Sequence, residues 1–232
     1  MRAEIIAAKA KEKAKKERAQ INQRYFKTGK GEYAEGDRFL GLSVPDTRTL
    51  AKEFRETPLE EAEKLLHSEY HELRLLALFI MIWQFKKGDQ ASRKRIYQLY
   101  LGNTKHINNW DLVDTTAEHI VGAYLYDRSH TVLEKLARSP TLWERRIAML
   151  SCFYFIRKKE FETALVIAEM LVNDKEDLIH KAVGWMLREI GERDQKSELG
   201  FLNRHYKTMP RTMLRYAIEK FEPALRMKYL KG

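Results

Sequence analysis

The fold is decided by the stretch Tyr70-His71-Glu72-Leu73-Arg74-Leu75-Leu76-Ala77-Leu78, whose pattern returns later in the chain. A basic residue precedes an apolar stripe with helical spacing, and residues 142–150, 178–186 and 210–218 repeat this arrangement. The spacing is roughly 35 residues once the segment around Trp110 is placed between the first two units, which is typical of two-helix repeats. We therefore predict an all-α fold, a curved α-solenoid of stacked helix pairs around one core.

The composition also predicts an almost entirely helical chain. Only 11 glycines and 5 prolines occur among the 232 residues, and the residues that dominate are good helix formers. Residues 1–24 predict an N-terminal helix and residues 27–45 a glycine-rich loop, after which a helix should begin near Asp46. We interpret residues 1–232 as a single domain whose helical repeats span 46–232, with the repeated basic position forming a strip of Arg and Lys on the concave surface.

The charge balance favours a phosphate-rich partner. The chain carries 43 Lys and Arg against 33 Asp and Glu, a formal net charge of +10. An excess of this kind promotes binding to nucleic acid through its phosphates. Nucleic acid is therefore the partner that charge and helix pattern together favour.

Cysteine usage and hydropathy predict a cytoplasmic protein. The only cysteine, Cys152, lies in an apolar run, so it cannot form an internal disulfide and is best interpreted as a small buried hydrophobe. No apolar run approaches the roughly 20 residues that cross a bilayer. The N-terminus lacks the apolar segment of a secretory signal. We expect a location in the cytoplasm, at the nucleoid when DNA is bound.

The segment at residues 108–114 carries the most chemistry. On a helix Trp110 and Asp114 are four residues apart and share one face, where an indole ring and a carboxylate both attract a cation. Both carboxylates also have a purely structural interpretation. Asp111 could be a first-turn residue that the helix dipole favours, and Asp114 could be a carboxylate paired with an arginine. Spacing alone does not identify which carboxylate is catalytic.

The tryptophans divide into two groups. Trp83 ends an apolar run and is expected in the core. Trp143 opens a helix after Pro140 and is expected to pack as a hydrophobic staple at the start of that helix. Trp110 and Trp185 stand in polar or small-residue surroundings on helices predicted to line the inner surface. Gly184, next to Trp185, would let another group approach the backbone closely.

Three motifs resemble the AlkD family of DNA alkylation repair glycosylases. They are WDLVD at residues 110–114, WERRIA at 143–148 and KAVGWMLRE at 181–189, and they occur in the family's order and at similar separations. The resemblance covers most of the chain, from about Arg24 to the last repeat. It implies a solenoid of HEAT-like repeats.

The resemblance also implies roles for individual residues. Asp114 matches the family's catalytic aspartate, and Trp110 and Trp185 match the two aromatics that contact the deoxyribose of the lesion. The implied DNA-binding residues are Arg146, Tyr25, Lys181 and Arg188, with the match for Tyr25 resting on a shorter motif. The implied partner is double-stranded DNA with alkylated purines. We expect a monomer, because DNA must reach the concave face.

The implied reaction is hydrolysis of the N-glycosidic bond of N3- or N7-alkylated purines, without a base-flipping pocket. Alkylation makes the purine a cationic and better leaving group, and positive charge moves onto the sugar as the bond breaks. A carboxylate at Asp114 could stabilise that charge and orient the attacking water. The lesion supplies much of the activation, so we expect no metal and no cofactor. The alternatives are a non-catalytic HEAT-repeat protein that binds damaged or branched DNA, and a protein–protein scaffold.

Overall fold

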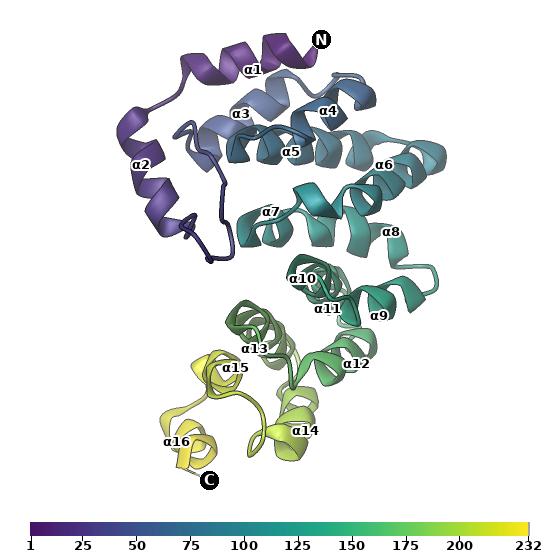
Figure 1. The fold of residues 1–232 in the computed structure, drawn as a ribbon. Coiled ribbons are helices and arrows are strands. Elements are labelled where there is room, and N and C mark those ends of the chain that lie inside the picture. Colours follow the sequence, from purple (N-terminus) through teal and green to yellow (C-terminus); the bar gives the residue numbers. More distant parts are fainter. Residues whose placement is uncertain (232) are drawn as a thin grey trace. The chain divides into compact units, whose positions relative to one another are not determined.

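The computed structural model describes residues 1–231, and by their contacts these form two compact units, Met1–Thr116 and a second one that begins at Ala117. Within residues 1–231 the regular elements are helices, and the only strand-like feature is an isolated bridge between Arg38 and Tyr70. None of these helices has the length and apolar character of a bilayer-spanning segment. The predicted all-α repeat fold is confirmed (Figure 1).

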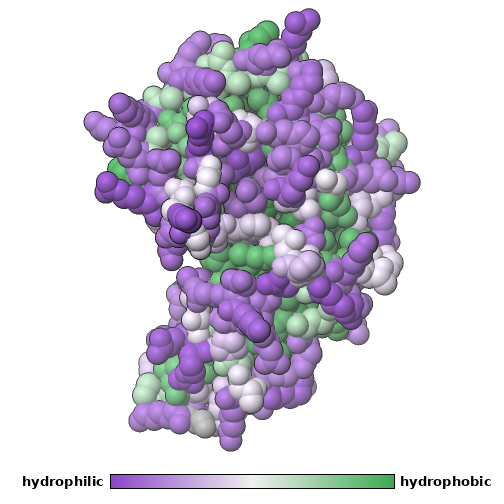
Figure 2. All heavy atoms as spheres, viewed as in Figure 1, coloured by the Kyte–Doolittle hydropathy of each residue, from purple (hydrophilic) through white to green (hydrophobic). Residues whose placement is uncertain are grey.

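The first unit is organised around helix α5, which is buried along most of its length. A helix that is apolar on all sides needs partners all round, and α5 packs on both α3 and α4. In Figure 2 polar residues cover most of the visible face, with apolar residues showing between them. The helices are α1 Ala3–Glu12, α2 Lys16–Tyr25, α3 Val44–Glu53, α4 Leu59–Leu66, α5 His71–Lys87, α6 Gln90–Gly102, the short η1 Thr104–His106 and α7 Trp110–Asp114.

The N-terminal segment is two helices rather than the single predicted one. The chain turns between α1 and α2 because the backbone N–H of Lys15 donates to the carbonyl of Leu40 at 3.0 Å. Gly41 follows with φ of 83°, and a Cβ there would lie 2.1 Å from the Lys15 carbonyl oxygen. Only glycine permits both this backbone conformation and this close approach. The glycine-rich loop therefore breaks the helix.

The glycine-rich loop is fixed by a buried carboxylate. Glu72, at the start of α5, accepts the backbone N–H groups of Leu40 at 2.9 Å, Gly41 at 2.7 Å and Leu42 at 3.2 Å. Ser43 then caps α3, which begins at Val44, slightly before the expected start. The loop has no regular secondary structure to pair its backbone N–H groups, and the Glu72 carboxylate accepts three of them instead. The loop is an ordered part of the first unit.

The second unit repeats one arrangement, a first helix followed by a longer or more buried second one. The predicted stretches at 142–150, 178–186 and 210–218 form the second helices α10, α13 and α15, as expected. The elements are the π-helix η2 Glu118–Gly122, α8 Ala123–Leu125, α9 Thr131–Ala137, α10 Leu142–Ser151, α11 Phe153–Arg157, α12 Glu162–Leu171, α13 Asp177–Gly191, α14 Gln195–His205, α15 Arg211–Ala217, the short η3 Ile218–Lys220 and α16 Pro223–Lys231.

The repeated basic position is turned inward in two of the four repeats, whereas Lys181 is partly exposed and Arg211 is exposed. Arg74 is buried, and its guanidinium donates to the carbonyl of Ser68 and to the carboxylate of Asp37. Arg145 in the second unit likewise donates to a carbonyl six residues earlier, and it pairs with a half-buried aspartate of the next repeat. The planar guanidinium has enough N–H donors to bind a backbone carbonyl just before the helix and the carboxylate of a neighbouring acid at the same time. Arg74 and Arg145 therefore stabilise their helix pairs.

Three side chains test the predicted core. Cys152 and Trp143 are buried, as expected, and burial raises the pKa of the Cys152 thiol far above its ordinary value. Trp83 is only half-buried and lines a groove on the surface. The prediction for Trp83 was wrong because the apolar run of α5 reaches the protein surface before it ends.

Replacing Gly184 with alanine is expected to lower the free energy of unfolding by about 1–3 kcal/mol, the usual cost of overpacking. Gly184 on α13 faces α15, and an added Cβ would lie 2.4 Å from the carbonyl oxygen of Met213. That clash outweighs the roughly 1 kcal/mol by which alanine favours a helix interior. Chemical denaturation measures the change. Gly200→Ala in α14 is the control, because a Cβ at Gly200 meets nothing within 4 Å. This variant should be slightly more stable than the unaltered protein. Equal stability of the two variants would contradict the close approach of α15 to Gly184.

Candidate functional site

The short helix α7 carries Trp110 and Asp114 on one face. Its first residue is fixed by Asn109, whose side-chain oxygen accepts the backbone N–H of Trp110 at 2.8 Å. Asn109 is fully buried, and its amide nitrogen donates to Asp37 at 3.3 Å. A cap of this kind satisfies a donor that the helix leaves unpaired. The start of α7 is therefore tied to the glycine-rich loop.

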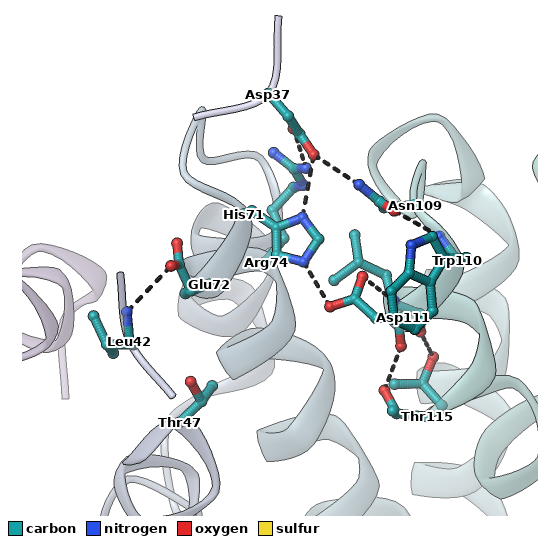
Figure 3. A network of polar contacts seen from close by, with 12 residues as sticks. Asp37, Leu42, Thr47, His71, Glu72, Arg74, Asn109, Trp110, Asp111 and Thr115 are labelled. Carbon is teal, nitrogen blue, oxygen red and sulfur yellow. Dashed lines mark hydrogen bonds and ion pairs between the residues drawn. The ribbon is translucent and has the colours of Figure 1, made fainter. Parts of the chain in front are cut away.

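Asp111, the first carboxylate of the motif, lies in the interior. It is 8% exposed and one oxygen lies 2.8 Å from Nε2 of His71, while the other accepts the backbone N–H of Leu112 (Figure 3). Asp114 is half-buried, and its charge contributes to raising the pKa of the buried Tyr100 hydroxyl, an effect dominated by burial. Of the two α7 carboxylates, Asp114 is the one that reaches the surface.

A buried charge network supports α7. His71 Nδ1 lies 3.1 Å from Asp37, which also accepts from Arg74, so the cations His71 and Arg74 face the anions Asp37 and Asp111 (Figure 3). Burial alone would lower the pKa of His71, but the carboxylates of Asp111 and Asp37 outweigh burial and raise this pKa to about 9. Burial likewise opposes ionisation of Asp37, while His71 and Arg74 hold its pKa below the ordinary value.

Aromatic rings surround Trp110. Phe26 stacks on the indole at a centroid distance of 5.2 Å and an interplanar angle of 17°, and Tyr25 meets it edge-on at 6.0 Å. Phe39 stacks on the far side of Phe26 at 5.0 Å. Tyr25 is 64% exposed, unlike the buried Phe26. The structure thus brings the predicted residues Tyr25 and Trp110 together at the surface, next to the end of α2.

The second unit carries the other predicted residues. Trp185 on α13 is half-buried, donates its Nε1 hydrogen to Glu189 at 3.0 Å and meets Phe153 edge-on at 5.6 Å. Arg146 is only 4% exposed and donates to the carbonyl of Leu178. The remaining two are partly exposed and form ion pairs, Lys181 with Asp177 at 2.7 Å and Arg188 with Glu219.

Sequence reasoning missed the residues that hold α7 in place. Asp37, His71 and Arg74 were not predicted as part of the site, although His71 and Arg74 stand within the repeat pattern. Phe26 was missed as well, although a pair of adjacent aromatics, Tyr25-Phe26, at the end of a charged helix is a signal that could have identified it. Asp37 offered no signal, because it comes from an irregular loop.

The fold and site define a helical-repeat protein that places an aromatic cluster and a carboxylate on one short helix. The model of the DNA alkylation repair enzyme family matches residues 6–221, nearly the whole chain. The chain belongs to the DNA alkylation repair enzyme family, which gives it a role in alkylation repair with DNA as the substrate.

Structural comparison agrees with this assignment at the level of the fold. A structure described as a predicted DNA alkylation repair enzyme from Enterococcus faecalis is similar to the chain with a TM-score of 0.71 and 16% sequence identity. The similarity covers 91% of this chain and 98% of the Enterococcus chain. No curated protein sequence matches the chain.

Proposed function

We propose that the protein is a monofunctional DNA glycosylase that removes cationic N3- and N7-alkylated purines from double-stranded DNA. The observation that carries the proposal is the arrangement on α7. Trp110 lies in an aromatic cluster at the surface, Asp114 shares its helix face, and Asp111 is engaged with the buried His71. Membership in the DNA alkylation repair enzyme family supports a substrate of this class.

The proposed reaction uses the charge of the lesion. The N-glycosidic bond breaks with its electron pair moving to the alkylated purine, whose positive charge is thereby neutralised, and the sugar becomes cationic. Asp114 stabilises the cationic sugar and orients a water whose oxygen bonds to C1′. The proton released from that water passes to Asp114 or to solvent. Trp110 and Trp185 are proposed to face the sugar with their π-systems.

DNA binding is proposed to rely on exposed side chains of both units. Tyr25 is the exposed aromatic beside Trp110, and Lys181 and Arg188 can exchange their present acidic partners for DNA phosphates. Arg146, being buried, is proposed to act by holding the start of α13. Recognition of this kind needs no extrusion of the base into a pocket, unlike most glycosylases. We expect a monomer, working at the nucleoid.

The proposal is tested by incubating the purified protein with methylated genomic DNA and identifying released bases by mass spectrometry. We expect free 7-methylguanine and 3-methyladenine, and a strand that stays intact until alkali cleaves it at the abasic site. Unmethylated DNA and methylated DNA without protein are the controls. Binding to methylated DNA without release of any base would support the non-catalytic DNA-binding alternative.

A further inference from the structure

A second surface of the first unit combines cations with an aromatic ring. A groove of about 360 Å³ lies between α3 and α5, within the size range of small-ligand sites. Its walls are formed by residues spaced to share a helix face, four apart on α3 and three or four apart on α5. They are Arg48 and Lys52 on α3, with Thr49 beside them, and Phe79, Ile82, Trp83 and Lys86 on α5.

The groove carries uncompensated positive charge. Among residues 1–231, Arg48, Lys52 and Lys86 form no ion pair, and no carboxylate lines the groove. Three other exposed arginines of this unit, Arg38, Arg55 and Arg95, are each paired with a glutamate. Unpaired cations grouped in a concavity concentrate an anionic ligand.

The cations are held against aromatic surface. The guanidinium of Arg48 lies over the ring of Phe79, 4.2 Å from its centroid, so its position is restricted before any ligand binds. Trp83 is half-buried and stands between this groove and a second depression of about 210 Å³. Arg55, Lys87 and the carboxylate of Glu56 line that second depression, and Arg55 pairs with Glu56 at 3.3 Å. The indole is thus flanked by the cations of the groove on one side and by Lys87 on the other.

We propose that this surface binds single-stranded nucleic acid, with one base stacked on Trp83 and the adjacent phosphates held in the two depressions. A duplex hides its base faces and would leave the indole unused, whereas an unpaired base presents a π-face that stacks on an aromatic side chain. Cations on both sides of one ring fit a continuing strand better than a mononucleotide. The surface lies about 18 Å along α5 from His71, so it is separate from α7.

The test measures the affinity of a fluorescein-labelled twelve-residue oligo(dT) by anisotropy over a range of salt concentrations. Trp83→Ala is expected to weaken binding about tenfold, the scale of one lost stacked base, while Trp83→Phe retains most of the affinity. Arg48→Gln, Lys52→Gln and Lys86→Gln combined should reduce the slope of log affinity against log salt by about 2, since each single-strand phosphate contact contributes about 0.7.

The matched control removes three exposed lysines elsewhere, Lys94→Gln, Lys196→Gln and Lys228→Gln. It should bind oligo(dT) within about threefold of the unaltered protein. Asp114→Asn should bind it unchanged, which separates this proposal from the glycosylase. The proposal is overturned if both groove variants, folded by circular dichroism, bind as the unaltered protein, if the control loses as much affinity, or if a duplex or poly-glutamate competes as well as unlabelled oligo(dT).

Discussion

Asp114→Asn is expected to reduce the release of 7-methylguanine from methylated DNA by about 10²–10⁴-fold, the range that a positioned acid–base group contributes. Asparagine keeps the shape of the side chain but removes the negative charge, and the charge is what would stabilise a cationic sugar and accept a proton from water. Single-turnover release, followed by mass spectrometry, measures the effect. Binding of methylated duplex should change far less than release, because the interaction is made mainly in the transition state.

Asp111→Asn is the matched control, since it makes the same change one helical turn earlier. Asp111 lies in the interior against His71, so its replacement should lower stability while release per folded molecule stays within a few-fold of the unaltered protein. Release by Asp114→Asn at the unaltered rate would remove Asp114 from the mechanism. If Asp111→Asn lost more release per folded molecule than Asp114→Asn, the proposed role of Asp114 would be wrong and Asp111 would be the catalytic carboxylate.

The repeat pattern predicted the fold because each repeat buries a similar apolar helix. The stripes at 142–150 and 178–186 lie in α10 and α13, and residues 210–218 and 70–78 lie almost entirely in α15 and α5. Gly184 was expected to allow a close approach, and α15 does pack against it. These features depend on side-chain periodicity within one helix, which a sequence displays directly.

The parts that could not be predicted depend on contacts between distant segments. The break after α1 follows from the approach of Gly41 to Lys15. The engagement of Asp111 follows from His71, which is 40 residues away in the sequence. Spacing left Asp111 and Asp114 as alternatives because both are compatible with a helix surface, and the difference in their burial could not be derived from spacing. Pairing with distant aspartates likewise holds Arg74 and Arg145 inside the protein.

Asp37→Ala is expected to lower the free energy of unfolding by about 3–5 kcal/mol, the cost of removing one partner from a buried ion pair. Asp37 is 7% exposed and accepts from Arg74, His71 and Asn109. Without the Asp37 carboxylate, the buried cations His71 and Arg74 lose an anionic partner. Asn109, which caps α7, loses a hydrogen-bond acceptor. Chemical denaturation at neutral pH measures the change. Glu69→Ala is the control, because it removes only the exposed partner of Arg38 and should cost less than about 1 kcal/mol.

The network also gives the stability a pH dependence with a defined sign. The pKa of His71 is raised from 6.5 to about 9, so its protonation stabilises the folded protein fully below pH 6.5, and this stability is lost as the pH rises through 9. The loss should be about 3 kcal/mol in the unaltered protein. Asp37→Ala should reduce this pH-dependent loss, since His71 then keeps only Asp111.

A second substitution, Arg74→Met, added to Asp37→Ala should recover part of the stability lost at neutral pH, because it removes the uncompensated cation. Strictly additive losses in the double variant would mean that Asp37 and Arg74 do not act as a pair.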